Sequence, residues 1–256
     1  MLLAIDAGNS NIVIGCLEGG EILRVFRMAT DISKSEDEYA VNIKDILSFN
    51  GVDSAAFGGV VISSVVPPLT KVLRDAVKML TGKDAVVVGA GVKTGLNILI
   101  EDPAQLGSDM VAAAVGAAAR YKLPAIIIDM GTATKLTVID KNGGFIGGAI
   151  FPGVALSMNA LSSETSQLPK VPIEAPAKCI SANTVDCMKS GAIFGNAAMI
   201  DGMAERFESE LGASASVIAT GGLADGIYQH CRRDIVHDPH LLLRGLGIIY
   251  EKNTRK

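Results

Sequence analysis

One short pattern occurs twice in this chain, and the repeat constrains the fold more than any other feature. The first copy runs from Leu2 to Ser10 and the second from Ala125 to Thr134. Each copy contains an apolar run, one aspartate, a glycine two residues later, and then small hydroxyl or amide side chains. The aspartates, Asp6 and Asp129, are separated by nearly half of the 256 residues. This spacing indicates an internal duplication.

Each copy predicts a β-hairpin that carries a carboxylate at the end of its first strand, because an apolar run bounded by glycine is typical of a buried strand. A turn at Gly8 or Gly131 would let backbone N–H groups bind an anion, and the aspartate would bind Mg²⁺ directly or through water. Two such tips facing each other across a cleft would hold a nucleoside triphosphate. The alternative is two ordinary turns built from Asp and Asn, which the recurrence of the pattern disfavours.

Length and composition favour a compact α/β enzyme with two halves. Hydrophobic residues make up 49% of the chain and aromatic residues 4%, and the net charge of −4 gives no electrostatic reason to expect nucleic acid or an anionic membrane as a partner. The four cysteines form no CxxC motif, and an apolar strand begins at once at the N-terminus. We therefore expect a soluble cytoplasmic protein with reduced thiols.

Strand and helix signals alternate along both halves. The first half predicts strands at 21–27, 56–63 and 85–88, a helix after Ser35, a helix begun by Pro67 and Pro68 that ends near residue 80, and a helix at 111–121 capped by Ser108 or Asp109. The second half predicts a helix ending near residue 161, a helix at 188–207, a strand at 216–219 and a final helix at 239–250. The predicted domains are 1–118 and 119–256.

Three motifs resemble the phosphate and adenosine motifs of the actin, sugar kinase and heat-shock chaperone superfamily: Asp6 to Ser10, Asp129 to Thr134, and Thr220-Gly221-Gly222. More narrowly, the whole chain is similar to the type III pantothenate kinases. The further matching segments are 37–39, 62–68, 93–95, 147–150 with 152–153, 183–185 and 242–247. Each match is weak alone, but together and in this order they are specific.

The resemblance implies a fold, an activity and a set of cofactors. The fold would be two ribonuclease-H-like domains related by internal duplication, with a nucleotide cleft between them. The activity would be transfer of the γ-phosphate of ATP to the primary hydroxyl of pantothenate, giving 4'-phosphopantothenate in the first step of coenzyme A biosynthesis. The family also implies Mg²⁺, a monovalent cation (K⁺ or NH₄⁺), and a homodimer with the acceptor pocket at the subunit interface.

The resemblance also implies roles for individual residues. Asp6 would help to hold Mg²⁺ and phosphate, Asp129 would be the monovalent-cation position, and Asp109 would be the catalytic base. The implied ATP-binding residues are Asp6, Gly8, Asn9, Ser10, Gly131, Thr132, Gly221 and Gly222, and the implied acceptor-side residues are Ile100, Gly107, Ser108, Asp109, Met110 and Thr184. The chemistry agrees for Asp109, because the start of a helix favours an ionised carboxylate. The alternative role for this residue is a simple helix cap.

Two positions depart from the family pattern. Where the family has Tyr-Asp-Asn-Pro, this chain has Ile100-Glu101-Asp102-Pro103, and where the family has Gly-x-Asp-Arg, it has Gly107-Ser108-Asp109-Met110. The acceptor side has thus lost an aromatic ring and a cation. Arg120 and Lys135 are the cations nearest these motifs in sequence.

Three functions therefore remain open. The first is a pantothenate kinase, and the second is a kinase of the same fold with another small hydroxylated acceptor. The third is a nucleotide-binding regulatory protein of the Bvg accessory factor type, with little turnover. The presence of Asp6, Asp109 and Asp129 argues against the third, since a pure binder needs no catalytic base.

Overall fold

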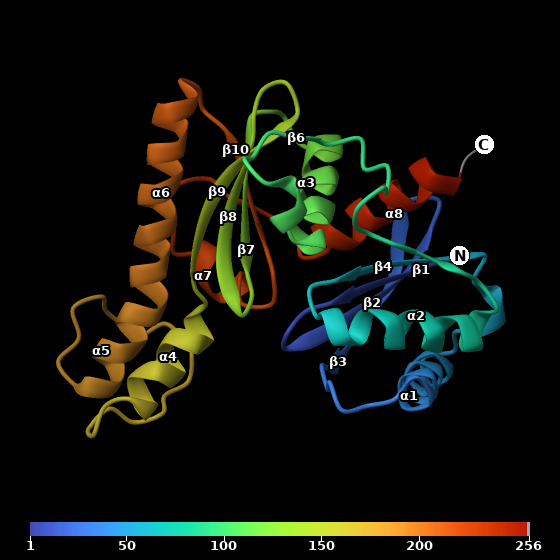
Figure 1. Cartoon of the computed structure of the whole chain (residues 1–256). Helices are drawn as coiled ribbons and strands as arrows, with labels where there is room; N and C mark the ends of the chain where they lie inside the picture. Colours follow the sequence, from blue (N-terminus) through green and yellow to red (C-terminus); the bar gives the residue numbers. More distant parts are fainter. Residues whose placement is uncertain (255–256) are drawn as a thin grey trace. The chain divides into compact units, whose positions relative to one another are not determined.

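The computed structural model describes residues 1–254, and the chain divides into two compact α/β units (Figure 1). Unit 1 contains residues 1–96, 101–119 and the chain from His240 onward, and unit 2 contains residues 97–100 and 120–239. The division at residues 119 and 120 lies next to the expected domain boundary. The expected second domain, 119–256, differs from this packing at its end, because the last helix contacts strands of unit 1.

Unit 1 is a five-stranded sheet with helices on both faces. Its strands are β1 (Leu2–Ala7), β2 (Asn11–Glu18), β3 (Glu21–Ala29), β4 (Gly59–Ser64) and β5 (Ala85–Val87), and its helices are α1 (Glu36–Phe49), α2 (Pro67–Thr81), α3 (Ser108–Arg120) and α8 (Leu241–Thr254), with short 3₁₀ turns at Ser54–Ala56 and Pro103–Gln105. The strand order is β3-β2-β1-β4-β5. The hairpin strands β1, β2 and β3 are antiparallel, whereas β1, β4 and β5 are parallel.

Local signals explain the helices that cover the first face. Ser35 and Glu38 form a capping box at the start of α1, and a proline at the first position starts α2. Tyr39 of α1 and Leu73 of α2 are buried with the sheet residues of one hydrophobic cluster. The predicted strand 56–63 begins later than expected, at Gly59, because residues 54–56 form a 3₁₀ turn.

Helix α8 covers the opposite face of the same sheet. A Cβ atom at Gly15 of β2 would lie 2.9 Å from Leu243 of α8, while Ile14 and Cys16, the neighbours of Gly15, belong to the cluster under α1 and α2. Since successive strand residues point to opposite faces, α8 and the pair α1–α2 enclose the sheet.

Unit 2 is a six-stranded sheet whose helices lie between residues 154 and 228. The strands are β6 (Asn97–Ile98), β7 (Ala125–Met130), β8 (Ala133–Ile139), β9 (Gly144–Pro152), β10 (Ser216–Thr220) and β11 (Val236–His237), and the helices are α4 (Val154–Ser163), α5 (Thr184–Ser190), α6 (Asn196–Leu211) and α7 (Asp225–Tyr228). A π-helical turn, Gly191–Gly195, joins α5 to α6. The helix predicted at 188–207 is therefore longer than expected and is interrupted by this turn.

The two sheets repeat the same topology, which confirms the predicted duplication. Unit 2 has the order β11-β10-β7-β8-β9-β6, so that β7, β8, β9, β10 and β11 correspond to β1, β2, β3, β4 and β5. The central strand is antiparallel to the next strand and parallel to the later one in both units. Within residues 1–254, the helices are too short or too polar to cross a membrane.

Candidate active site

The first tip comprises residues 6–11, at the end of the β1–β2 hairpin. The N–H of Gly8 donates to the carbonyl of Asn11 over 3.0 Å. The hydroxyl of Thr30 donates to the carbonyl of Gly8 over 2.6 Å, which ties the turn to the chain after β3. The side chains of Asn9 and Ser10 are exposed. The turn is thus held by hydrogen bonds to the backbone of Gly8, and the residues that follow it, Asn9 and Ser10, are solvent-exposed.

The carboxylate of Asp6 is held by a buried serine hydroxyl. Ser63, which aligns with Asp6 on the parallel strand β4, is fully buried and donates to Oδ1 of Asp6 over 2.9 Å. The hydroxyl of Ser108 lies 3.0 Å from that of Ser63 and also accepts the N–H of Ser64 over 3.0 Å. These contacts connect the first tip to the first residue of α3.

Asp109 follows Ser108 in the first turn of α3. Its Oδ1 accepts the N–H of Met110 over 2.7 Å, and its side chain is half-buried. The N-terminal N–H groups of a helix carry partial positive charge, which favours a carboxylate there. This contact agrees with either predicted role, base or cap. The expected cap by Ser108 is wrong in detail, because its hydroxyl bonds to β4 rather than to a helical N–H.

The second tip comprises residues 129–133, at the end of the β7–β8 hairpin. The N–H of Gly131 donates to the carbonyl of Ala133 over 3.1 Å, and the N–H of Gly153 donates to the carbonyl of Thr132 over 3.1 Å. Thr132 is exposed. This turn has one residue fewer than the first tip, since Met130 pairs with Thr134 whereas Ala7 pairs with Ile12.

The carboxylate of Asp129 forms an ion pair inside the hairpin. Lys135 is directly opposite Asp129 on β8, and its Nζ lies 2.7 Å from Oδ2 of Asp129. The side chains of Lys135 and Asp129 are only 15% and 24% exposed. The sequence singled out Lys135 as a nearby cation, and the strand register now shows which carboxylate it neutralises.

Gly221, which belongs to the predicted adenosine motif, packs against the second tip. Its φ is +93°, and a Cβ atom there would lie 2.6 Å from the backbone N of Met130 and 2.7 Å from Oδ1 of Asp129. Only glycine satisfies both the conformation and the space. Gly222 follows it and is exposed. Unit 2 thus brings Asp129, the predicted monovalent-cation position, together with three predicted ATP-binding residues: Gly131, Thr132 and Gly221.

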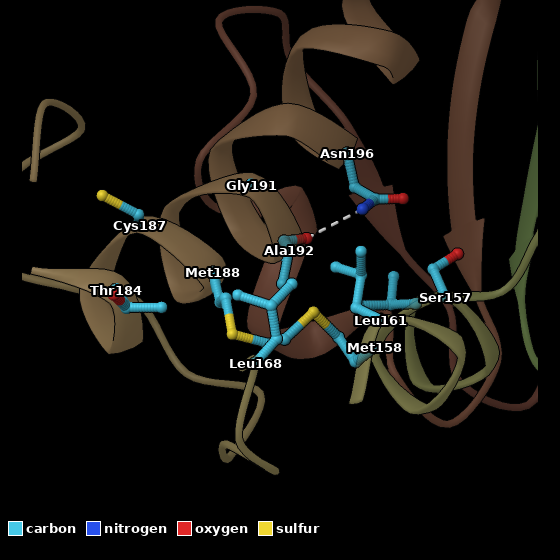
Figure 2. A pocket seen from close by; sticks show the side chains of 11 residues that line it. Ser157, Met158, Leu161, Leu168, Thr184, Cys187, Met188, Gly191, Ala192 and Asn196 are labelled. Carbon is cyan, nitrogen blue, oxygen red and sulfur yellow. Dashed lines mark hydrogen bonds between the residues drawn. The ribbon is translucent and has the colours of Figure 1, made fainter. Parts of the chain in front are cut away.

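Thr184 lines a separate cavity of about 430 Å³ within unit 2. Figure 2 shows Met158, Leu168 and Met188 lying close together in it, and the amide of Asn196 donates to the carbonyl of Ala192 at one end. The lining residues are Val154, Ser157, Met158, Leu161, Leu168, Thr184, Cys187, Met188, Gly191, Ala192 and Asn196. The lining contains no charged side chain and neither tip.

The other predicted acceptor residues belong to two units. Ile100 follows β6 in unit 2, whereas the segment Gly107 to Met110 belongs to unit 1. Ile100 and Met110 are both half-buried. A common acceptor pocket formed by these residues stays a prediction.

Two residues beside the predicted set hold the two aspartates. Ser63 contacts Asp6 and Lys135 contacts Asp129. Residues 1–254 contain no group of three or more His, Cys, Asp or Glu side chains that could together hold a metal ion. Mg²⁺ is often bound by one carboxylate together with substrate phosphates, so Asp6 suits a metal that arrives with a nucleotide.

Comparison with known proteins identifies the family. The model of the family described as type III pantothenate kinase matches residues 2–206. The type III pantothenate kinase of Moorella thermoacetica is 41% identical over 254 residues, covering 99% of this chain and 100% of the relative. That of Brevibacillus brevis is 40% identical over 253 residues, covering 99% of each chain.

Solved structures with low sequence identity share the fold. A conserved protein from Campylobacter jejuni, proposed to be a Baf family transcriptional activator, has a TM-score of 0.62 and 19% identity, with 99% of this chain and 100% of that chain covered. Component A of (R)-2-hydroxyglutaryl-CoA dehydratase from Acidaminococcus fermentans has a TM-score of 0.57 and 16% identity, with 97% and 96% covered. The fold is therefore the expected α/β fold of two duplicated ribonuclease-H-like domains. Together with its full-length relatives and its two carboxylate tips, this makes the chain a member of the type III pantothenate kinase family.

Proposed function

We propose that the protein transfers the γ-phosphate of ATP to the primary hydroxyl of pantothenate, giving 4'-phosphopantothenate for coenzyme A biosynthesis. The observation that carries this proposal is the pair of carboxylate tips, Asp6 and Asp129, in a chain that matches the family over almost its whole length. The enzyme would work in the cytoplasm as a homodimer, without nucleic acid or membrane as partner. The nucleotide cleft predicted between the two halves is part of the proposal.

On the ATP side, each tip would bind phosphate with groups that the chain already orients. Asn9 and Ser10 are exposed donors on a turn held by Thr30, and Thr132 is an exposed hydroxyl on the second tip. Asp6 would hold Mg²⁺, and a bound Mg²⁺ neutralises the charge of the β- and γ-phosphates. Gly221 and Gly222 would lie under the adenosine.

Asp109 would receive the proton of the attacking hydroxyl. Phosphoryl transfer depends on positioning and charge stabilisation, with a carboxylate near the nucleophile. Asp109 lies in the first turn of α3, where the partial positive charge of the helix N–H groups attracts a carboxylate, and the bond to the Met110 N–H orients one oxygen. The hydrogen bonds from Ser108 through Ser63 to Asp6 would hold the base, Asp109, at a fixed distance from Asp6, the carboxylate that would bind Mg²⁺.

A second candidate function is a kinase for another small hydroxylated acceptor. The observation that favours it is the acceptor side, where Ile100 and Met110 replace the tyrosine and arginine of the family pattern. A methionine side chain does not make the charge-assisted hydrogen bonds with which arginine binds a carboxylate such as that of pantothenate. The cavity beside Thr184 adds no charged side chain.

ATP consumption with and without pantothenate, combined with detection of 4'-phosphopantothenate, tests the proposal. Product formation at rates well above a blank supports the pantothenate kinase. ATP binding without pantothenate-dependent turnover points to another acceptor, which a panel of small hydroxylated acids would identify. ATP binding with no turnover on any acceptor supports the regulatory alternative.

The variants Ile100→Tyr and Met110→Arg, made singly and together, test the acceptor side. A restored charge-assisted bond contributes roughly 1.5–3 kcal/mol, or about 10- to 150-fold in kcat/KM for pantothenate. Met79→Arg is the matched control, because Met79 is 58% exposed on α2 and has no predicted role. An unmodified protein that already uses pantothenate efficiently, with no gain in the variants, would contradict the second function.

A further inference from the structure

The second tip carries a positive charge of its own. Lys135 and Asp129 are directly opposed on the antiparallel strands β7 and β8, so their side chains leave the sheet on the same face. The Nζ atom of Lys135 lies 2.7 Å from Oδ2 of Asp129. Both side chains are largely shielded from solvent, and partly buried ion pairs are screened less than exposed ones.

Comparison with the first tip shows that a hairpin of this kind forms without a lysine opposite the aspartate. The residue opposite Asp6 on β2 is Val13, which brings no charge, and the hydroxyl of Ser63 donates to Asp6 from the parallel strand β4. The two hairpins have the same strand order and pairing, yet the position opposite the aspartate holds a valine in the first hairpin and a lysine in the second. Lys135 is therefore a feature of this site rather than of the fold.

A monovalent cation at Asp129, which the family resemblance implies, fits this arrangement poorly. K⁺ would have to compete with an ammonium that has the same charge and is tethered through the chain. Breaking a partly buried ion pair leaves an uncompensated charge, which is unfavourable. NH₄⁺ itself offers nothing that the Lys135 ammonium lacks, since both carry one positive charge and several N–H donors.

We propose that the Lys135 ammonium is a built-in monovalent cation, which supplies the positive charge that stabilises the ATP phosphates at the second tip. This inference rests on the proposed function, because it assumes that ATP binds at the second tip. An ammonium has several N–H donors, so the same group can contact both a carboxylate and a phosphate. The lysine thereby links Asp129 to phosphate, and nucleotide binding does not depend on K⁺ or NH₄⁺.

The test measures the Kd for ATP·Mg²⁺ and, separately, turnover, each in chloride salts of K⁺, NH₄⁺ or choline at equal ionic strength. For the unmodified protein we expect the Kd and the turnover to agree within about twofold across the three salts. Lys135→Thr should weaken ATP binding in choline by about 10- to 100-fold, the range of one charge-assisted hydrogen bond. K⁺ or NH₄⁺ should recover part of this loss.

Two controls separate the role of the charge from that of the fold. Lys135→Arg keeps the positive charge and should remain indifferent to K⁺. Lys141→Met removes an exposed lysine from the turn after β8 and should behave like the unmodified protein. Unmodified protein that binds ATP at least tenfold more tightly in K⁺ than in choline overturns the inference and leaves the proposed function standing. Failure to bind ATP in every salt overturns both.

Discussion

The two tips share a backbone plan but hold their carboxylates differently. Asp6 accepts a hydrogen bond from Ser63, whereas Asp129 forms an ion pair with Lys135. The hydroxyl of Ser63 is a neutral donor and brings no charge to Asp6, and a carboxylate is a ligand that suits a divalent cation. The ammonium beside Asp129 brings a positive charge and N–H donors, which suit a phosphate oxygen. The two hairpins share their strand pairing, and the residues opposite the aspartates, Val13 and Lys135, make the electrostatic surroundings of the two carboxylates different.

The largest effect should come from exchanging the carboxylates for amides. Asp6→Asn keeps an oxygen for Ser63, so we expect little change in stability but a loss of turnover of about 10³-fold or more, because metal charge stabilisation contributes several kcal/mol. Asp129→Asn should lose less activity and more stability, since it leaves Lys135 without its anion. Steady-state kinetics and thermal unfolding of both variants measure the difference.

A double variant sharpens this comparison. Adding Lys135→Met to Asp129→Asn removes the uncompensated charge and should recover most of the lost stability. Equal loss of activity in the two asparagine variants, with no recovery in the double variant, would mean that the tips do not differ in the way described.

The next effect concerns Asp109, which the Ser108–Ser63 contact links to the first tip. Asp109→Asn should lower kcat by about 10²–10⁴-fold, the usual contribution of a positioned base, while the Kd for ATP changes little. Rapid-quench kinetics and ATP titration separate the two quantities. A loss of kcat below roughly tenfold would restrict Asp109 to capping α3.

A smaller effect is expected from the packing beneath the second tip. A Cβ atom at Gly153 would overlap the carbonyl oxygens of Gly131 and Thr132, so Gly153→Ala should destabilise the protein by about 1–3 kcal/mol. Gly202→Ala is the control, because Gly202 lies in α6 with open space around its Cβ position, and it should stabilise by about 0.5–1 kcal/mol. Denaturant unfolding of both variants gives the values, and equal effects would contradict a tightly packed second tip.

The smallest expected effect concerns Glu208 on α6, in the helical part of unit 2. Burial raises the pKa of Glu208, but the Ala215 N–H and the Arg233 guanidinium outweigh it and hold the pKa below the ordinary value of 4.5. A lowered carboxyl pKa contributes stability above the ordinary value, and this stability is lost as the pH falls through the folded-state pKa.

Glu208→Gln should therefore remove about 1 kcal/mol or less at neutral pH, and less still as the pH falls below the ordinary pKa. Urea unfolding of both proteins at several pH values measures this. A difference that grows towards acid pH would contradict the assignment.

Segments with a regular apolar pattern or with clear helix-start and turn residues were predictable from the sequence. Contacts between segments that are distant in the sequence were not. Both hairpins, α1 and α2 follow from apolar runs, a capping box and paired prolines. The π turn within 191–195 leaves no sequence signal, since its residues are ordinary helix and glycine positions. Ser63 became part of the site only through the parallel pairing of β1 with β4, and sequence spacing does not specify such a pairing. The role of Lys135 became visible only through the register of the β7–β8 hairpin, which places this residue opposite Asp129.

Helix α8 has a consequence for the order in which the protein is made. Helix α8 closes a face of the sheet formed by β1 to β5, although residues 120–239 lie between this sheet and α8 in the sequence. It crosses α3 so closely that a Cβ atom at Gly245 would overlap the Ala112 carbonyl. All of residues 120–239 leave the ribosome before this layer exists. Domains usually fold in the order of synthesis. Here, unit 1 begins before unit 2 in the sequence but is completed after it. A nascent chain that stops short of Leu241 leaves the apolar face of the unit 1 sheet exposed. Such a surface promotes aggregation and is the kind that chaperones bind.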